Sequence, residues 1–381
     1  MKKHFPVIAI ITVLISAMVI CYSIPAIAGS RWQSPKPVKS KRRSRTIKKE
    51  QSKTLTTVTS CPAVTPGPIP YPMYGVTIES IEDDLDNLTP IIDSLKGLHY
   101  KPTVRLVFNK WKESDEKKGE DTNAYNAAAS AIRGCSYIMG ELLDSFSLRK
   151  CDANCYEARA QRYVAGLGHN VDIWEVGNEV NGDWARRRKD SKNPKVINED
   201  SLEIGEKIRR AFKVAKNAGK ETALTLYYND DRKGRSCWER EQDKMLDWAR
   251  NYVPSELKKE GGLNYVLISY YDDKGHCRDK KTGELLQPDW QSDFRELAKE
   301  FPHAKVGFGE RGTKCQNGES REECLARKSA YVNSVYSVPV DHPAYVGGVF
   351  WWYFKEDMVP STTKLWSVLN DVIKSGQKPH N

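Results

Sequence analysis

The chain has 381 residues, with 60 Lys and Arg against 50 Asp and Glu, and a formal net charge of +10 at pH 7. This length suffices for one large domain or two small ones. Residues 1–60 hold 12 of the basic residues and one acid, Glu50, so the remainder, with 48 basic and 49 acidic residues, is nearly neutral. We therefore predict no nucleic-acid partner for the main part of the chain.

Residues 1–28 have the pattern of an export signal. Two lysines precede an apolar run from Phe5 to about Ile20, and the AIA sequence at 26–28 predicts cleavage after its last alanine. Because the apolar run is long for a signal, an uncleaved anchor is the alternative. The basic KSKRRSRTIKK sequence downstream opposes export, since positive charge usually stays inside, but the cysteines favour it. We expect a secreted, periplasmic or cell-surface protein.

Residues 29–72 are predicted to form a flexible, basic and Pro-rich linker. Its first part, 29–60, is rich in Ser, Lys, Arg and Pro and has almost no large apolar side chains that could drive folding. The prolines of CPAVTPGPIPYP, at 61–72, forbid a helix and suit an extended approach to a domain edge. A solvated tether is the simplest interpretation, and contact with an anionic cell-surface polymer is the alternative.

From residue 73 to residue 381, short apolar stretches alternate with longer amphipathic segments. We predict strands at 73–78, 103–108, 136–142, 171–177, 222–228, 265–271, 305–310 and 345–352. We predict helices at 82–98, 121–133, 155–167, 201–219, 238–252, 289–301, 321–337 and 361–374. In the helix at 201–219, apolar residues recur near helical spacing and Gly219 occupies a C-cap position.

Eight strand–helix repeats predict an α/β fold in which residues 73–381 form one (β/α)8 barrel, a TIM barrel. Each interval between strands is long enough for the helical crossover that parallel strands require. The strands are mostly apolar on both faces, as a covered parallel sheet needs. A doubly wound open sheet is the alternative, but no Gly-rich nucleotide loop follows the first strand.

The cysteines predict disulfide bonds. One, Cys21, lies in the predicted signal, and the other eight are Cys61, Cys135, Cys151, Cys155, Cys237, Cys277, Cys315 and Cys324. An even number in an exported chain favours disulfides, and the CDANC and CQNGESREEC sequences could each close locally. Cys237 and Cys277, after strands five and six, could bridge adjacent loops. Zinc is the alternative, but no second tightly spaced pair accompanies CDANC.

Polar and aromatic side chains gather where the predicted strands end, which is where barrel enzymes place their chemistry. VDIWEVGNEVNG ends the fourth strand in an Asn-Glu pair, and KVGFGERG ends the seventh in a glutamate. The side chains offered by the second, fourth, sixth, seventh and eighth strands are Arg105, Asn178, Glu179, Tyr270, Tyr271, Glu310, Trp351 and Trp352. Two carboxylates are therefore expected to face one mouth.

Two carboxylates that flank one bond meet the chemical requirement of glycoside hydrolysis. One carboxyl group must be protonated so that it can donate to the leaving oxygen, and the other must be ionised. Burial raises the pKa of one group, and a nearby cation such as Arg105 lowers the pKa of the other. Tryptophan rings stack on the apolar faces of sugars, which gives the aromatic residues a role in such a mouth.

WEVGNE at the end of a fourth strand and GFGERG at the end of a seventh resemble the clan of retaining (β/α)8 glycoside hydrolases, which includes cellulases, mannanases and xylosidases. The likeness covers about residues 73–375. It implies that Glu179 is the general acid/base, that Glu310 is the nucleophile, and that Asn178 binds the sugar 2-hydroxyl. A retaining mechanism also implies that the two carboxyl groups lie about 5 to 5.5 Å apart.

The same likeness implies that Arg105 and a tyrosine of the sixth strand contact the nucleophile. Tyr271, which is last on its strand, is preferred to Tyr270, although many relatives carry a His and a Tyr spaced two apart there. The likeness also implies that Trp351 forms the floor of the sugar subsite at the cleaved bond. The neighbouring Trp352 would point to the opposite face of the strand.

Other acids and aromatic residues have weaker claims on the site. Glu175 is interpreted as a structural or supporting acid, whereas Glu79 and Glu141 are candidates for substrate binding. The aromatic residues that could line sugar subsites, or merely pack in loops, are Trp111, Trp184, Tyr228 and Trp238. Each site residue also has an ordinary interpretation, such as a solvated glutamate or an arginine paired with a structural acid.

We therefore predict hydrolysis of a β-linked polysaccharide or oligosaccharide by retaining double displacement, with no metal or organic cofactor. The first alternative is a barrel at the cell surface that binds glycan without cutting it, and the presence of both Glu179 and Glu310 opposes it. The second is a metabolic barrel acting on phosphorylated substrates, and the predicted export and disulfides oppose that one.

Overall fold

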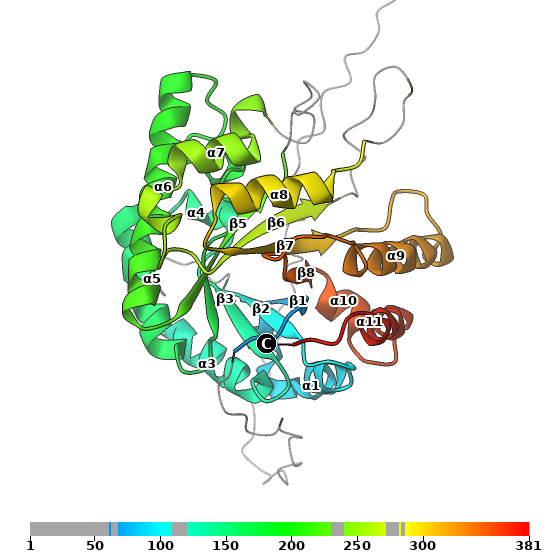
Figure 1. The fold of residues 1–381 in the computed structure, drawn as a ribbon. Coiled ribbons are helices and arrows are strands. Elements are labelled where there is room, and N and C mark those ends of the chain that lie inside the picture. The colour runs from blue at the N-terminus through cyan, green and yellow to red at the C-terminus, as the bar shows by residue number, and fades with distance from the viewer. Residues whose placement is uncertain are drawn as a thin grey trace, which may run out of the picture. The chain divides into compact units, whose positions relative to one another are not determined.

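The structure is a computed structural model that describes residues 61, 68–108, 120–229, 240–271, 282 and 286–380. Eight parallel strands close into a barrel in the order of the sequence (Figure 1). They are β1 (Met73–Glu79), β2 (Thr103–Val107), β3 (Tyr137–Glu141), β4 (Ile173–Gly177), β5 (Glu221–Tyr227), β6 (Tyr265–Tyr271), β7 (Lys305–Gly312) and β8 (Gly347–Trp351). The predicted (β/α)8 fold is confirmed, and no strand boundary differs by more than two residues from the prediction.

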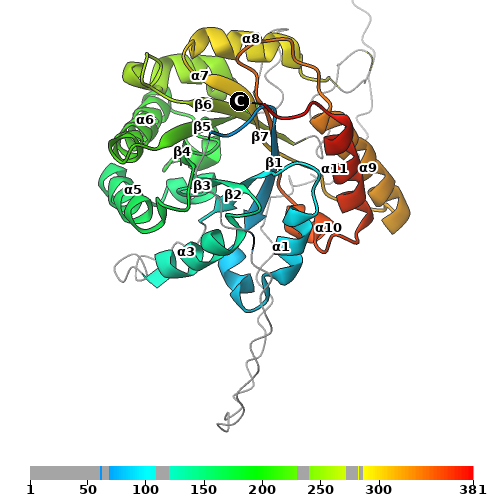
Figure 2. The same cartoon turned by 60° about the horizontal axis from the view of Figure 1, so that its bottom comes forward.

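The longer helices surround the strands as an outer ring (Figure 2). The helices are α1 (Thr89–Lys96), α3 (Glu120–Ile132), α4 (Ser145–Leu148), α5 (Ala153–Leu167), α6 (Pro194–Asn217), α7 (Met245–Tyr252), α8 (Trp290–Glu300), α9 (Arg321–Tyr336), α10 (Phe354–Met358) and α11 (Lys364–Ser375). Short 3-10 turns are η1 (Ile81–Asn87), η2 (Asp183–Ala185), η3 (Glu241–Asp243) and η4 (Ser255–Leu257). The sequence did not predict the short α4 and α10, and the helix expected at 82–98 is divided into η1 and α1.

Helix α6 begins seven residues earlier than the apolar repeat predicts. Asn193 caps it by accepting a hydrogen bond from the Lys195 N–H at 3.0 Å, and Pro194 occupies its first position. Both residues are favoured at helix starts. The first seven residues include only two large apolar side chains, Val196 and Ile197, so hydrophobic spacing alone does not reveal this start. At the other end Gly219 has a φ of +70°, as expected of a residue that ends a helix.

The barrel interior changes from apolar to polar along its axis. Near the starts of the strands it is filled by side chains that include Met73, Met139, Ile173, Leu267 and Phe350. Nearer their carboxyl ends the buried interior side chains are Thr77, Arg105, Glu141, Glu175, Thr225 and Ser269. The larger apolar core lies between the strands and the helices. The polar layer is therefore at the end of the barrel where the site was predicted.

Two of the three register shifts between neighbouring strands bear on which side chains face inward. Between β6 and β7, Ile268 pairs with Phe308 and Tyr270 pairs with Arg311, so two residues of β7 oppose one residue of β6. This bulge turns Glu310 into the barrel while both Phe308 and Arg311 face the helices. A second shift lies between β1 and β8, where Val349 has a φ of +53°.

Three disulfides are present among the described residues. Cys151–Cys155 and Cys315–Cys324 are the two local bridges that the sequence suggested, and Cys61–Cys135 joins distant segments. Cys237 and Cys277 lie outside the described residues. Near the C-terminus, His380 and Tyr71 form a short antiparallel bridge beside the start of β1. Among the residues that the structure describes, no helix combines the length and apolar character needed to cross a membrane.

Candidate active site

Glu310, near the end of β7, is held by side chains from several other strands. Arg105 Nη1 lies 2.8 Å from Glu310 Oε1, and Asn178 Nδ2 donates to the same oxygen at 3.0 Å. Tyr271 Oη donates to the other oxygen, Oε2, at 2.6 Å. The backbone N–H of Glu310 donates to Ser269 Oγ at 3.0 Å. Glu310 is only 4% exposed, so these groups replace the water that an ionised carboxylate otherwise requires.

Arg105 lies at the centre of a buried cluster of carboxylates. Its Nε donates to Glu175 Oε2 at 2.6 Å, and its Nη2 lies 3.0 Å from Glu141 Oε2. Glu175 also accepts a hydrogen bond from Thr225. Burial opposes the charge of Arg105, but the surrounding carboxylates outweigh this effect and raise its pKa. Arg105 therefore contacts both Glu310 and the acid that the sequence interpreted as a support.

Glu179 follows β4 in a conformation that few residues adopt. Its φ is +44°, in the left-handed region that disfavours side chains other than glycine. It is 6% exposed, and its Oε1 has no hydrogen-bond partner within the described part of the chain. Burial raises its pKa well above the ordinary value for glutamate, and the charge of Glu310 raises it further. This environment favours the protonated form of Glu179, which is the form that can act as an acid.

The loop after Glu179 is fixed by contacts that the sequence did not predict. Asn181 Nδ2 donates to the carbonyl oxygens of Tyr227 and Asp243, at 2.9 and 3.0 Å. Its Oδ1 accepts from the Tyr227 N–H at 2.7 Å. Arg186 forms a buried ion pair with Asp243. Because these partners come from β5 and η3, the strained backbone of Glu179 is held by neighbouring elements.

Two predicted substrate-binding residues lie outside the site. Trp351 is fully buried, packs against Tyr331 of α9, and donates from Nε1 to Asp357 Oδ2 at 3.1 Å. Its predicted place at the mouth is wrong, because residues on the two sides of Trp351 along the strand face inward instead. Trp352 is the neighbour that meets the cluster, with Arg105 Cζ 5.8 Å from the centre of its ring.

Tyr270 is likewise misplaced by the sequence prediction. It is 3% exposed and packs edge-on against Tyr228 and Trp290, on the helix side of the sheet. Strand β6 is regular, so Tyr265, Leu267, Ser269 and Tyr271 share the inner face and Tyr270 must face outward. The same contacts place Tyr228 in the outer core and remove it as a subsite candidate.

The remaining acids and aromatic residues that the sequence suggested for the site lie in different parts of the structure. Trp184, in η2, donates to Ser145 Oγ at 2.9 Å and stacks with Phe146, whose side chain is exposed. Glu141 belongs to the cluster around Arg105, and Glu79 lies at the end of β1. Trp111 and Trp238 lie outside the described residues. Trp184 and Phe146, which follow β4 and β3, therefore form an aromatic surface on the carboxyl-end side of the barrel.

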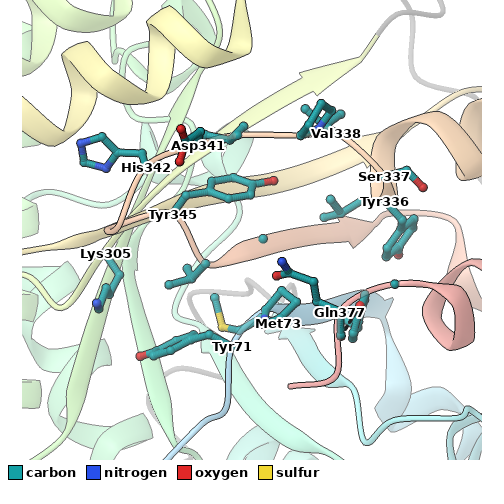
Figure 3. A pocket seen from close by; sticks show the side chains of 18 of the residues that line it. Tyr71, Met73, Lys305, Tyr336, Ser337, Val338, Asp341, His342, Tyr345 and Gln377 are labelled. Carbon is teal, nitrogen blue, oxygen red and sulfur yellow. Dashed lines mark hydrogen bonds between the residues drawn. The ribbon is translucent and has the colours of Figure 1, made fainter. Parts of the chain in front are cut away.

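A cavity of about 1120 Å³ opens at the other end of the barrel, between the starts of the strands and the segment 337–346 (Figure 3). Its wall includes Met73 and Lys305, the first residues of β1 and β7, together with Tyr71 and Gln377. None of the predicted site residues contributes to it. In barrel enzymes the active site lies at the opposite end, where the strands end. This cavity is therefore not the candidate active site.

Asp144 is an acid beside the site that sequence reasoning missed. It is the N-cap of α4 and accepts a hydrogen bond from the Phe146 N–H at 2.9 Å. Burial, followed by the charge of Glu310, raises its pKa to about 6. Its position directly after a loop from β3 gave no signal that would distinguish it from an ordinary capping aspartate.

The raised pKa of Asp144 predicts a pH dependence of stability. The folded state favours the protonated form, so this contribution is complete below the ordinary aspartate pKa and is lost as pH rises through about 6. We expect Asp144→Asn to gain stability relative to the wild type as pH rises from about 4 to 7. Urea unfolding across this range measures the difference. The control is Asp152→Asn, which makes the same exchange at the N-cap of α5. If the stability of both variants, relative to the wild type, changed equally with pH, the prediction would be contradicted.

Comparison with known proteins supports the fold. No family model and no curated protein matches the sequence. A beta-glucosidase from Thermotoga maritima in complex with methoxycarbonyl-substituted glucoimidazole has a TM-score of 0.58 and 12% identity, with coverage of 83% of this chain and 100% of that chain. The apo structure of a beta-glucosidase designated 1317 has a TM-score of 0.52 and 14% identity, covering 78% and 89%. At these identities the likeness shows the shared fold alone.

Proposed function

We propose that the chain is a glycoside hydrolase that cleaves a β-linked polysaccharide or oligosaccharide with retention of configuration. The observation that carries the proposal is the contrast between two neighbouring carboxyl groups. Glu310 is surrounded by Arg105, Asn178 and Tyr271, which stabilise its anion. Glu179 has a raised pKa and an unpartnered oxygen within the described chain. This pairing is the one that acid-assisted nucleophilic displacement requires.

In the proposed first step, a Glu310 oxygen attacks the anomeric carbon while Glu179 transfers its proton to the leaving oxygen. The bond between the anomeric carbon and that oxygen breaks, and a glycosyl ester forms on Glu310. In the second step Glu179, now ionised, removes a proton from water, and the resulting oxygen attacks the anomeric carbon. Glu310 leaves as a carboxylate and Glu179 regains its proton. The glycoside and one water molecule are therefore the only reactants that the two steps require.

The groups around Glu310 have distinct roles in this scheme. Arg105 and Tyr271 orient the carboxylate and stabilise its charge in the resting enzyme and as it leaves. Asn178 has a free Oδ1, within the described residues, which suits a hydrogen bond from a sugar hydroxyl. Trp352, Trp184 and Phe146 supply aromatic surface for sugar rings. On the evidence of the sequence, we also propose that the protein is exported. We propose further that its basic N-terminal segment adheres to an anionic polymer.

A panel of β-glucans, mannans, xylans and bacterial exopolysaccharides tests the proposed activity. Reducing-sugar release by the wild type, absent in a Glu310→Gln sample prepared in parallel, would support it and identify the substrate class. A matched control is Glu256→Gln, because Glu256 is exposed in η4 and remote from the site residues in sequence. Binding of a glycan without any release would instead favour the non-catalytic barrel.

The role of Glu179 predicts a dependence on the leaving group. Glu179→Gln removes the proton donor, so hydrolysis of an unactivated glycan should fall by about 10² to 10⁴-fold. A dinitrophenyl glycoside of the same sugar leaves without protonation, and the first step on it should be nearly unaffected. Burst kinetics on the aryl substrate and steady-state rates on the glycan measure the two effects. Equal losses on both substrates would contradict the assignment of Glu179 as the acid.

A further inference from the structure

The cluster around Arg105 contains more negative groups than its single cation can balance. The three guanidinium nitrogens each face a different carboxylate: Nε faces Glu175 at 2.6 Å, Nη1 faces Glu310 at 2.8 Å, and Nη2 faces Glu141 at 3.0 Å. The side chains of Arg105, Glu141 and Glu175 are at most 1% exposed. If all three acids were ionised, the cluster would carry two unbalanced negative charges away from water. Buried groups in this situation take up a proton instead.

The contacts of the three acids indicate where that proton resides. Glu310 is approached by Arg105, Asn178 and Tyr271, and Glu175 by Arg105 and Thr225. Glu141 has only its ion-pair contact with Arg105, and neither of its oxygens has a hydrogen-bond partner among the described residues. Its anion is therefore the least stabilised of the three. Burial, with Glu175 and Glu310 adding to it, raises the pKa of Glu141 well above its usual range despite the opposing charge of Arg105.

Among the described residues, Arg105 is the cation whose charge acts on Glu141, and the groups of the neighbouring elements have other contacts. Asp144, before α4, is another acid and raises the pKa of Glu141 further. Tyr156 of α5 has a raised pKa, so it is neutral, and its hydroxyl donates to the Val176 carbonyl at 3.1 Å. Arg159 of α5 donates to the carbonyl oxygens of Leu142 and Phe108 at 2.6 Å. Arg105 is thus the cation that these carboxylates share.

We propose that Glu141 is a positioning residue that holds a proton at neutral pH, so that the charge of Arg105 is left to Glu175 and Glu310. A neutral Glu141 still fills the space beside Nη2 and fixes the guanidinium, but it does not compete for its charge. Its role in catalysis rests on the proposed function, since it acts by leaving the charge of Arg105 to the carboxylate of the nucleophile, Glu310. Its protonation is a property of the folded protein and can be measured without any substrate.

The proposal also predicts coupling between Glu141 and Glu310. The negative charge of Glu310 is one of the groups that keep the proton on Glu141. When that charge disappears, as in a glycosyl ester or in the Glu310→Gln variant, Glu141 should lose its proton at a lower pH. A side chain that serves only to fill space would show no such response.

Infrared difference spectroscopy of the full chain in D₂O buffer at pH 7 tests this inference. A protonated carboxyl group gives a C=O stretch that is separate from carboxylate bands. We expect Glu141→Gln to lose one such band, Glu179→Gln to lose a different one, and the exposed-site control Glu256→Gln to lose none. An unchanged set of bands in Glu141→Gln would overturn the proposal.

Two further spectra keep the inference testable if Glu141→Gln does not fold. Glu179→Gln retains Glu141 and should still show a protonated-carboxyl band at pH 7; absence of any band would overturn the proposal. In Glu310→Gln the protonated-carboxyl band that Glu179→Gln retains should disappear at a lower pH than in the wild type, and an unshifted titration would overturn the coupling. A protein that hydrolyses no glycan but shows these bands would refute the proposed function alone.

Discussion

Replacing Glu310 with Gln should lower kcat by at least about three orders of magnitude on whichever glycan the wild type cleaves, equivalent to about 4 kcal/mol of activation free energy. Gln is nearly isosteric and can keep the contacts with Arg105 and Asn178, so the fold should survive. The amide, however, cannot form the glycosyl ester. The rate is measured by product release at saturating substrate, with circular dichroism to verify folding.

The Glu256→Gln variant is the matched control for this loss. It removes a glutamate from the exposed turn η4, outside the barrel interior, and should retain wild-type kcat. A Glu310→Gln enzyme with a rate close to that of the control would mean that another group is the nucleophile. The site would then have to be relocated, although the barrel fold would be unaffected.

Replacing Arg105 with Met should have the second large effect, on stability as well as on activity. Arg105 is the shared cation of three buried carboxylates, and its loss leaves them without a counterion. Removing one partner of a buried ion pair typically costs about 3 to 5 kcal/mol of unfolding free energy. Without the guanidinium the nucleophile also loses a contact that orients its carboxylate, so kcat should fall together with stability.

The pH dependence of the Arg105→Met variant identifies the cause of its instability. Loss of the cation raises the folded-state pKa values of the neighbouring carboxyl groups. Groups with raised pKa values contribute stability at low pH and lose that contribution as pH rises, so the deficit relative to wild type should be smaller at pH 5 than at pH 8. Denaturant unfolding at both pH values measures the two deficits.

A surface arginine provides the comparison for this experiment. Arg250 of α7 pairs with Asp247 and Glu300, but its side chain is 48% exposed. Exposed ion pairs contribute little, so Arg250→Met should change stability only slightly at either pH. A loss in Arg105→Met that matches this control, or one that does not depend on pH, would contradict the view of Arg105 as the counterion of the cluster.

Much of the barrel could be predicted because its signals are local. Each strand is a short apolar run and each longer helix an amphipathic one, so the eight repeats were visible without tertiary information. Regular alternation also selected Tyr271 over Tyr270, because β6 runs without a break to its last residue. The start of α6 has one buried apolar side chain, Ile197, and α4 is a single turn, so both were too short in apolar pattern to be recognised.

The site was harder to predict where strands are irregular. Simple alternation puts Glu310 on the same face as Phe308, but the bulge in β7 turns the two in opposite directions. The shift between β1 and β8 similarly prevents the orientation of Trp351 from being read off the strand start. The apolar run of the seventh strand placed Glu310 near the end of that strand, but its alternation could not show that the side chain faces inward.

The buried cluster could not be predicted from local sequence. Arg105, Glu141 and Glu175 each lie on a strand whose other residues are mostly apolar, and nothing nearby along the chain indicates the partner of each. Closure of the barrel brings β2, β3, β4 and β7 to one polar layer. The shared cation, and the number of acids competing for it, therefore become visible only in the folded structure.

The configuration of the first product tests the central claim most directly. The wild type is mixed with the glycan it cleaves, and proton NMR follows the anomeric signals before mutarotation equilibrates them. Double displacement through Glu310 predicts that the β-anomer appears first from a β-linked substrate. Initial appearance of the α-anomer would show that water attacks the sugar directly, and would contradict the assignment of Glu310 as a covalent nucleophile.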